Sequence, residues 1–337
     1  MIYPWFHITE DDKAFYNHFL KDRMPDKILD VHVHMNKLEH VKAITPQRMQ
    51  EDWALECGLH MDYEASQFYY STLFPGKTVE LNAFPFPLPE VDIPANNEYL
   101  GSLADEGKIN AMMSVRPEWD AETCEEMLLK HQFTGFKPYP YLASQEKGAD
   151  ISVFDFMPHH QIAVLNKHKK AMMLHLPRHG RLPDKDNIRE ILELRQKYPD
   201  MKLILAHFGR CFDANFFKKG MGALGKDLEG IYFDCAAVTN AEVFALALEM
   251  LDTKQFLFGT DEPILLWHGE QTWNEGGSAV NFTREDFSWN KHPKTPKEEE
   301  EFVFIVYRQI NNLLEALGNN ETAKQQIFYA NAKTVLG

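Results

Sequence analysis

The apolar run ILDVHVHM at 28–35 carries three side chains that can do chemistry: Asp30, His32 and His34. Side chains alternate between the two faces of a strand, so we expect these three on one face. An acid and two imidazoles buried together need partners, and a divalent metal ion is a partner for two neutral imidazoles. Ordinary hydrogen bonds to both histidines are the alternative. The other face is apolar and is expected to pack against helices: Leu29, Val31, Val33 and Met35.

Three further polar residues stand where other apolar runs finish. His175 ends AMMLHL, His207 ends KLILAHF and Asp261 ends QFLFGTD. Barrel enzymes place catalytic groups at the carboxyl ends of their strands, and the first and last strands of a closed barrel are neighbours. Asp261 can therefore reach the two histidines of the first run. Together these side chains favour a metal site over unconnected structural histidines.

Short apolar runs alternate along the chain with longer segments of helical periodicity. The runs are rich in Val, Ile, Leu and Phe, which is typical of strands buried on both faces of a parallel sheet. Eight strands, each followed by a helix, predict an α/β fold of the (β/α)8 TIM-barrel class. An open doubly wound sheet is the second choice, but no G-x-G-x-x-G or P-loop follows the first run. The runs lie at 27–35, 78–84, 109–115, 134–139, 171–176, 202–208, 230–236 and 255–261.

Two stretches are too long for plain connections, 57–77 and 263–294. Both are expected to be long loops that shape a substrate site, and the second should lie over the C-terminal face because it follows the last run. A helix is expected over 296–317, with Thr295 opening it in a capping box and Gly318 ending it.

Composition sets limits on the class of protein. The chain has 337 residues, with 35 basic and 50 acidic side chains and a formal net charge of −15. Its 44% hydrophobic content excludes a disordered chain, and its acidic balance argues against nucleic acid as a partner. The first residues lack a signal peptide, no run approaches the roughly 20 apolar residues that span a bilayer, and four cysteines form no C-x-x-C pair. We therefore expect one cytoplasmic barrel domain over 1–337, including an N-terminal extension at about 1–26, with no membrane partner.

These motifs resemble the amidohydrolase superfamily, and more narrowly its amidohydrolase-2 branch, over nearly the whole chain. The branch contains aminocarboxymuconate-semialdehyde decarboxylase, resorcylate decarboxylases and several hydrolases. D-x-H-x-H at 30–34 resembles the first-strand motif of the branch, KYPDMKLILAHFGR at 197–210 its sixth strand, and FGTDEP at 258–263 its eighth strand. The C-terminal IFYANAKTVLG resembles its closing segment.

The resemblance implies a (β/α)8 barrel with one or two divalent ions, commonly zinc. Asp261 would accept a proton as well as bind the ion, and His207 would face the substrate as an acid, a base or an electrostatic group. Asp30 is expected to stand behind the ligands, in a hydrogen bond at the barrel floor. Matching positions imply the ligands of one ion: His32, His34, His175 and Asp261.

The number of ions depends on Lys137, which ends the fourth run. In binuclear relatives a carbamylated lysine at a corresponding place bridges two ions. Here we expect a free amine that contacts the substrate, with carbamylation and a second ion as the alternative. Arg178 either grips a substrate carboxylate with two parallel bonds or fixes a loop by an ion pair, and Arg210 is a weaker candidate of the same kind. Further pocket residues are expected at Tyr139, Trp267 and His268.

The first hypothesis is an enzyme, a metal-dependent hydrolase that attacks a small ester, lactone or amide with a metal-activated water. The alternative is a lyase, a non-oxidative decarboxylase of a small carboxylic acid that uses the same ligands. Some decarboxylases of the branch have an arginine near the first connecting helix, and here only Arg48 lies in that region, which slightly favours hydrolysis. A non-catalytic binding protein on a decayed barrel is the third option. The expected partner is a small-molecule substrate, with a carboxylate as one option, and a homo-oligomer is left open.

Overall fold

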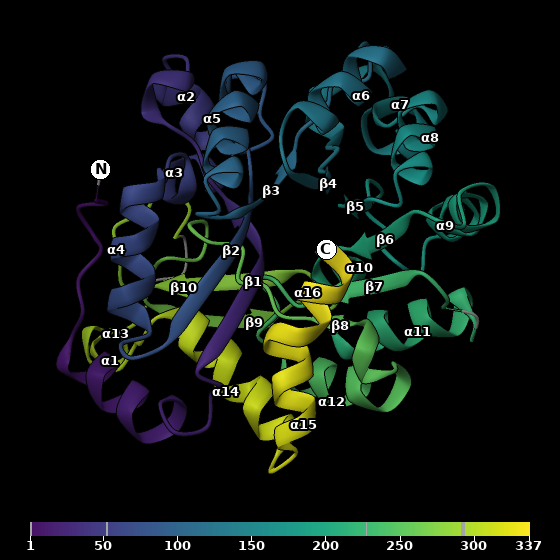
Figure 1. Ribbon diagram of the computed structural model, residues 1–337. Coiled ribbons are helices and arrows are strands. Elements are labelled where there is room, and N and C mark those ends of the chain that lie inside the picture. Colours follow the sequence, from purple (N-terminus) through teal and green to yellow (C-terminus); the bar gives the residue numbers. More distant parts are fainter. Residues whose placement is uncertain (1, 52, 227, 291–293) are drawn as a thin grey trace.

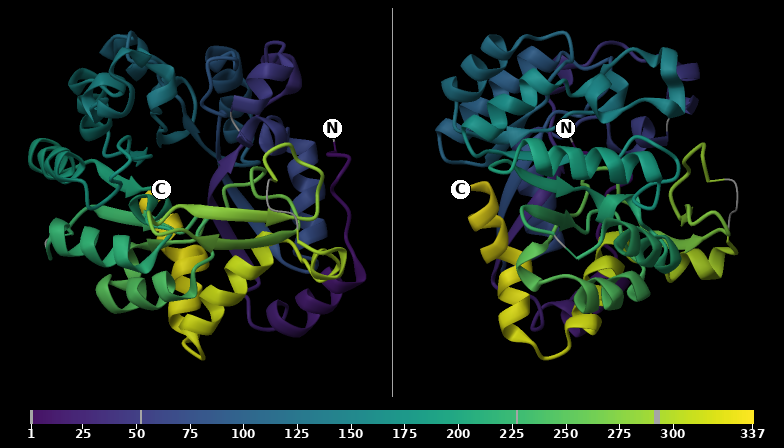
Figure 2. Two further views of the ribbon diagram at one scale, coloured as in Figure 1. Left: turned by 180° about the vertical axis from the view of Figure 1, so that it is seen from behind. Right: turned by 90° about the vertical axis from the view of Figure 1, so that its right-hand side faces the viewer.

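The computed structural model describes residues 2–51, 53–226, 228–290 and 294–337, and Figures 1 and 2 show its ribbon from three sides. One sheet holds eight parallel strands, each paired with the next along the chain. The predicted (β/α)8 barrel is confirmed. The strands are β1 (Lys27–His34), β2 (Thr78–Phe84), β3 (Asn110–Met113), β4 (Phe133–Phe136), β5 (Ala171–Leu174), β6 (Lys202–Leu205), β7 (Ile231–Asp234) and β8 (Phe256–Leu257).

Backbone hydrogen bonds between β1 and the residues that follow β8 close the sheet into a barrel. The amide of Asp261 donates to the carbonyl of His32 at 3.0 Å, and the amide of His34 donates to the carbonyl of Glu262 at 2.8 Å. Closure therefore ties the segment after β8 directly to the two histidines of β1.

Helices follow the strands and surround the barrel (Figure 1). In the described ranges, no helix is long and apolar enough to cross a membrane. The α-helices are α1 (Glu10–Phe15), α2 (Pro46–Glu51), α3 (Trp53–Gly58), α4 (Tyr63–Leu73), α5 (Ile93–Asp105), α6 (Ala121–Lys130), α7 (Val153–Phe156), α8 (His159–Lys167), α9 (Lys185–Lys197), α10 (His207–Arg210), α11 (Ala214–Leu224), α12 (Ala241–Met250), α13 (Pro296–Glu300), α14 (Ile305–Leu317), α15 (Glu321–Gln325) and α16 (Asn331–Leu336).

A bulge in β1 changes which of its side chains face the pocket. The register between β1 and β2 shifts between Asp30 and Val33, so two residues of β1 lie opposite one residue of β2. The prediction that Asp30 shares a face with His32 and His34 is therefore wrong. Asp30 lies on the helix side, where its carboxylate accepts a hydrogen bond from the hydroxyl of Tyr70 in α4 at 2.7 Å.

The same bulge turns Leu29 and Val31 into the barrel, although the simple alternation predicts that they pack against helices. Beyond the bulge, Val33 and Met35 do pack in the outer core between barrel and helices, as predicted. Leu29 and Val31 join an interior cluster with side chains from the other strands and from α16: Phe84, Met112, Ala171, Met173, Ile204, Leu257, Ala332, Val335 and Leu336.

The stretch 57–77 is mostly helix, so its prediction as a long loop is wrong. Asp62 caps α4 by accepting a hydrogen bond from the amide of Ala65 at 2.8 Å. The helix packs its buried face, including Tyr69 and Leu73, into the outer core of the barrel. Most of this stretch is therefore helix, and α4 packs against the barrel.

The stretch 263–294 contains a hairpin of β9 (Gly269–Trp273) and β10 (Ala279–Thr283), which form a separate two-stranded antiparallel sheet. In the left-hand view of Figure 2 this hairpin runs across the front of the barrel. Residues 291–293 of the predicted loop lie outside the described residues.

The single helix expected over 296–317 is broken into α13 and α14. Thr295 does open α13 in the predicted capping box, and Gly318 follows the end of α14 with a positive φ of 53°. The break has a backbone cause, because Phe304 forms an antiparallel bridge with His268 just before the hairpin. The extended residues that make this bridge cannot be helical.

A buried charged cluster joins the N-terminal segment to the base of the hairpin. Nδ1 of His268 lies 2.6 Å from Glu285, and its Nε2 lies 2.9 Å from Asp12. Burial opposes a charge on His268, but its bonds to the two carboxylates raise its pKa above the ordinary value. Burial likewise opposes ionisation of Asp12 and Glu285, yet the imidazole lowers the pKa of both. The cluster is thus one cation held between two anions.

We expect His268→Ala to lower the free energy of unfolding by about 3–5 kcal/mol, because it leaves two buried carboxylates without their cation. The stabilisation from His268 should be lost as the pH rises through its raised pKa. The stabilisation from Asp12 and Glu285 should be lost as the pH falls through their lowered pKa values. Urea unfolding of wild type and variant at several pH values measures both effects. His18→Ala, at an exposed position, is the matched control, and an equal loss in both variants would contradict the prediction.

Candidate metal centre

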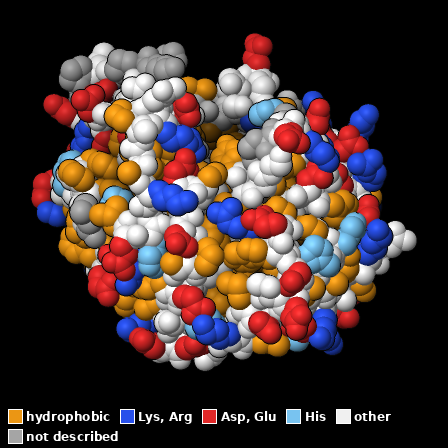
Figure 3. Space-filling view, turned by 90° about the horizontal axis from the view of Figure 1, so that it is seen from above, with side chains coloured by type: hydrophobic (Ala, Val, Ile, Leu, Met, Phe, Trp, Pro, Cys, Tyr) orange, Lys and Arg blue, Asp and Glu red, His pale blue; other side chains and the backbone are white. Residues whose placement is uncertain are grey.

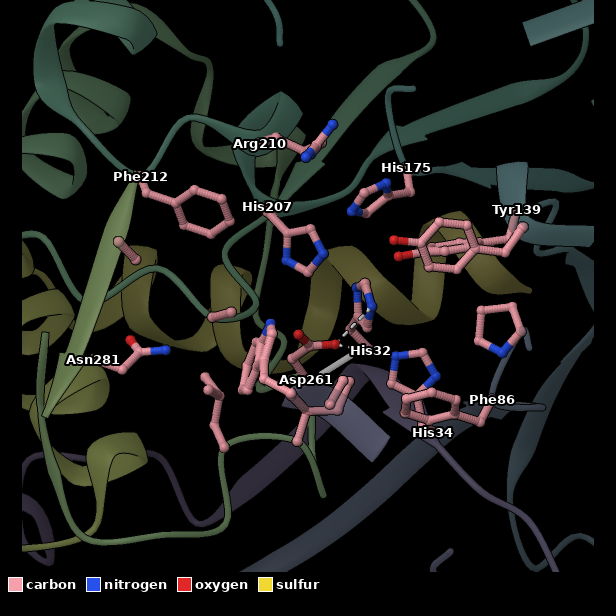
Figure 4. Close-up of a pocket in the computed structure, with 18 of the residues that line it drawn as sticks. His32, His34, Phe86, Tyr139, His175, His207, Arg210, Phe212, Asp261 and Asn281 are labelled. Carbon is pink, nitrogen blue, oxygen red and sulfur yellow. Dashed lines mark hydrogen bonds and ion pairs between the residues drawn. The ribbon is translucent and has the colours of Figure 1, made fainter. Parts of the chain in front are cut away.

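A pocket of about 330 Å³ opens at the carboxyl ends of the barrel strands. Figure 4 shows the side chains that point into it from several strands. The residues that the sequence predicts for the metal site all line this pocket, together with the predicted lysine: His32, His34, Lys137, His175, His207 and Asp261.

His32, His207 and Asp261 form one group, since one ligand atom of each lies within 4.8 Å of the others. The Nε2 atoms of His32 and His34 each lie 3.2 Å from Oδ1 of Asp261. His175 is outside the group of three and lies beside His207, with 5.5 Å between the ring centroids. The resemblance made His175 a ligand and His207 a substrate group, whereas the geometry brings His207 to the carboxylate.

Asp234, at the end of β7, is a site residue that the sequence reasoning missed. Its Oδ2 lies 3.0 Å from Nδ1 of His32, so it orients that ring and leaves Nε2 facing Asp261. Its Oδ1 accepts the backbone amide of His207 at 2.9 Å. The run IYFDCA offered the same signal as the other strands, a polar residue where an apolar run finishes.

The backbone at two of these residues is strained. His207 has a φ of 56° and Asp261 a φ of 74°, a region that residues with a side chain rarely adopt. Such a conformation costs about 1–3 kcal/mol and persists only where the surroundings fix it. Here the amide of His207 is held by Asp234, and the amide of Asp261 is held by the carbonyl of His32. The strain therefore serves to aim both side chains into the pocket.

Burial keeps three of the histidines neutral. It lowers the pKa of His34 and His207 to about 4 and that of His175 well below its ordinary value. Nδ1 of His207 lies 2.7 Å from the carbonyl of Ala236, to which it donates, so its Nε2 presents a lone pair. Nδ1 of His34 and of His175 is buried without a hydrogen-bond partner in the described part of the chain. Neutral imidazoles are the form that binds metals.

The two carboxylates of the site favour a positive charge between them. Burial and Lys137 lower the pKa of His32, but Asp234 and Asp261 outweigh them and raise it overall. Burial alone would raise the pKa of Asp261, yet the neighbouring imidazoles hold it well below the ordinary value. Imidazole and carboxylate donors around one point, with a field that attracts cations, fit a divalent metal ion.

The structure separates the predicted substrate residues. Tyr139 lines the pocket, with its ring centroid 4.8 Å from that of His175. Arg178 is not among the described residues that line it. Its Nη2 donates to Glu190 at 2.7 Å and its Nη1 to Asn187 at 2.9 Å, which matches the loop-fixing alternative.

Trp267 and His268 do not line the pocket, so the prediction for these two is wrong. Trp267 is fully buried, and its indole nitrogen donates to the carbonyl of Ile264 at 2.9 Å. His268 belongs to the charged cluster at the hairpin base. Both residues are followed closely by the extended segment of the hairpin, whose direction the sequence pattern does not reveal.

Two arginines replace Arg178 at the pocket, Arg181 and Arg210. Nη1 of Arg210 donates to the carbonyl of Leu176 at 2.9 Å, and Figure 4 shows its guanidinium close to His175. Arg181 reaches the pocket from the loop after β5. Sequence reasoning missed Arg181, because nothing in LPRHGRL distinguishes one arginine of that loop from the other.

We expect Asp234→Asn to weaken binding of a divalent ion by about 10–100-fold, the usual effect of removing a carboxylate behind a ligating imidazole. An amide can no longer fix the ring of His32 with a charged acceptor. Competition with a chromophoric chelator measures the affinity. Glu229→Gln, exposed before the same strand, is the control. Equal affinity in the two variants would remove Asp234 from the site.

No family model and no curated protein matches the chain, but solved structures match its fold. A dihydroxybenzoic acid decarboxylase from Polaromonas sp., with bound manganese and the inhibitor 2-nitroresorcinol, has a TM-score of 0.57 at 13% identity, over 93% of this chain and 97% of that chain. Amidohydrolase 2 from Bifidobacterium longum subsp. infantis has a TM-score of 0.54 at 12% identity, over 93% and 99%.

A third structure, named "probable 2-pyrone-4,6-dicarboxylic acid hydrolase", comes from Acinetobacter baumannii and contains citric acid. It has a TM-score of 0.56 at 10% identity, over 92% of this chain and 99% of that chain. Identities this low establish a shared architecture. The chain has the (β/α)8 barrel fold of the amidohydrolase structures.

Proposed function

We propose that this protein is a metal-dependent hydrolase of the amidohydrolase type that acts on a small ester, lactone or amide. The observation that carries the proposal is the convergence of His32, His34 and Asp261 at one end of a closed barrel, with His207 beside them. The fold shared with structures named as hydrolases and decarboxylases supports it.

The proposed cofactor is one divalent ion, with zinc as the first choice. His32, His34, His175 and Asp261 would hold it, and His207 stands close enough to take the place of His175. When bound, such an ion supplies a Lewis acid and activates water. Asp261 is ionised beside the site and can accept a proton. The unprotonated Nε2 of His207 faces the same space and is the second acceptor.

Two cations of the pocket support a substrate with a carboxylate: Lys137 and Arg210. Neither has a carboxylate within ion-pair distance among the residues that the structure describes. Burial lowers the pKa of Lys137 to about 8, although the charges of Asp234 and Asp261 act to raise it. On the face seen in Figure 3 acidic and basic side chains are interspersed. Among the described residues that line the pocket, Asp261 is the carboxylate, and it lies with the histidines of the metal site. An anionic substrate would supply the missing partner.

Decarboxylation of a small carboxylic acid is the second candidate, and the same cations favour it because they would hold the carboxylate that leaves. Arg48, the arginine considered for this reaction, donates to Glu90 at 2.7 Å and is not among the described pocket residues. Hydrolysis therefore stays first. A screen of lactones, amides, esters and aromatic acids separates the two reactions, since hydrolysis adds water to the product and decarboxylation releases carbon dioxide.

The proposal includes the state of Lys137, which decides how many ions the site holds. Lys137 carries a free amine and the site holds one ion, whereas a carbamate at Lys137 would bring a second.

All four cysteines are free and buried, which supports a cytoplasmic location. A protein that binds no metal would instead support the third option, a binding protein on a decayed barrel.

Replacing both His32 and His34 by Ala should abolish metal binding, because the pair supplies two of the imidazole donors. Purified wild type should hold roughly one equivalent of ion, measured by elemental analysis. His159→Ala is the control, since the side chain of His159 is 43% exposed and remote from the pocket. Full metal content in the double variant would refute the site.

Asp261→Asn should lower kcat by about 10²–10⁴-fold, because the amide keeps the size and one oxygen but cannot accept a proton. The variant should lose less metal affinity than the double histidine variant, since a single donor changes. The measurement is turnover of the metal-replete variant on a substrate found by the screen. Turnover close to wild type would exclude Asp261 as the base and move the same test to His207.

A further inference from the structure

The β9–β10 hairpin forms part of the pocket wall without being part of the barrel sheet. Gln271 and Asn281 are opposite one another in the hairpin register, and both line the pocket. Figure 4 places Asn281 at the side of the pocket away from Tyr139. A two-stranded hairpin is marginally stable by itself in water. Its place over the pocket must therefore depend on contacts outside the hairpin.

Contacts at the base and middle of the hairpin fix the end that is remote from its turn. The amide of Gly269 donates to the carbonyl of Val303 at 3.0 Å. Halfway along, the hydroxyl of Thr239 donates to the side-chain oxygen of Gln271 at 2.8 Å. The turn, which joins the two strands, needs a separate anchor.

Arg181 supplies that anchor from the loop after β5. Its guanidinium donates through Nη1 to the carbonyl of Gly277 and through Nη2 to the hydroxyl of Ser278 at 2.7 Å. The same group lies 5.7 Å and 5.2 Å from the ring centroids of Phe212 and Phe216. The side chain is only 7% exposed, and no carboxylate pairs with it in the described part of the chain. The turn thus provides the polar partners that a buried cation requires.

The turn is shaped to receive the arginine. Gly277 has a φ of 68°, and a Cβ at this position would lie 2.6 Å from the ring of Phe216 and 3.3 Å from Nη1 of Arg181. Only glycine permits this close approach without a shift of the aromatic ring. Arg181 itself has a φ of 60°, so the backbone on the arginine side of the contact is strained, whereas Gly277 adopts its positive φ freely.

We propose that Arg181 is a positioning residue that clamps the hairpin over the pocket, so that Gln271 and Asn281 select the substrate. The clamp joins the loop that follows His175 to the hairpin turn, and it therefore controls entry to the site of the proposed function. It rests on that function for the identity of the substrate alone. The closure itself is measurable in a protein that has no known substrate.

Hydrogen exchange of the full-length protein, followed by mass spectrometry, tests the clamp. In Arg181→Ala the amides of 269–283 should exchange about 10–100-fold faster, because hydrogen bonds from a charged donor are lost. Amides of β5 and β6 should keep their wild-type rates and serve as the internal reference. Arg189→Ala is the matched control, since the side chain of Arg189 is 65% exposed on the helix that follows. Gly277→Ala should reproduce the effect from the hairpin side.

Chemical rescue separates a clamp from a general structural role. Ethylguanidinium added to Arg181→Ala should slow exchange of the hairpin again, whereas ethylammonium should not, because it cannot donate to both acceptors in one plane. With a substrate from the screen, Arg181→Ala should raise KM by at least about 10-fold and leave kcat nearly unchanged, the pattern of lost binding.

Wild-type exchange in both Arg181→Ala and Gly277→Ala would overturn the clamp. Faster exchange over the whole barrel, without rescue, would overturn it too and make Arg181 a residue of general stability. Faster exchange of the hairpin with unchanged KM would retain the clamp and refute selection by the hairpin. Absence of any turnover or bound metal would refute the proposed function and leave the exchange result standing.

Discussion

The bulge within β1, between Asp30 and Val33, is the constraint on which the pocket depends. Without the bulge, strict alternation along the strand would put Leu29 and Val31 on the face opposite His32 and His34. It would also put Asp30 in the barrel interior. Asp30 stabilises the bulge, because its Oδ1 accepts the amide of His32 at 3.1 Å and the amide of Thr260 at the same distance.

The carboxylate of Asp30 is fully buried, and burial raises its pKa to about 6 even though four hydrogen bonds oppose the rise. Two of these bonds come from hydroxyl groups, those of Tyr70 and Thr260. The residue therefore connects α4, β1 and the segment after β8. Its role is to set the register of the closing strands, and the predicted metal ligands of β1 and Asp261 take their positions from that register.

Much of the barrel follows from the sequence, and the reason is physical. Strands buried on both faces read as apolar runs, and the runs end where polar groups are needed. That logic places His175, His207 and Asp261 correctly at the pocket. The same logic applies to Asp234 at the end of β7, but an isolated aspartate belongs to no motif, so the sequence alone does not single it out.

Other features cannot be read from periodicity. The alternation of Asp30, His32 and His34 is perfect in the sequence, so a bulge leaves no trace in it. Arg178 and Arg181 share one short loop, and only the backbone conformation decides that one meets Glu190 and the other the hairpin turn. The hairpin itself has strands that are half-exposed on both faces, which weakens the pattern that would identify them.

The C-terminal helix α16 closes the end of the barrel opposite the pocket. Its residues Ala332, Val335 and Leu336 pack among the interior side chains of the barrel at that end. That end is filled by apolar side chains, so in the proposed function substrate and product would share the opening at the carboxyl ends of the strands. The product would then have to leave before the next substrate enters, and turnover could be no faster than that release.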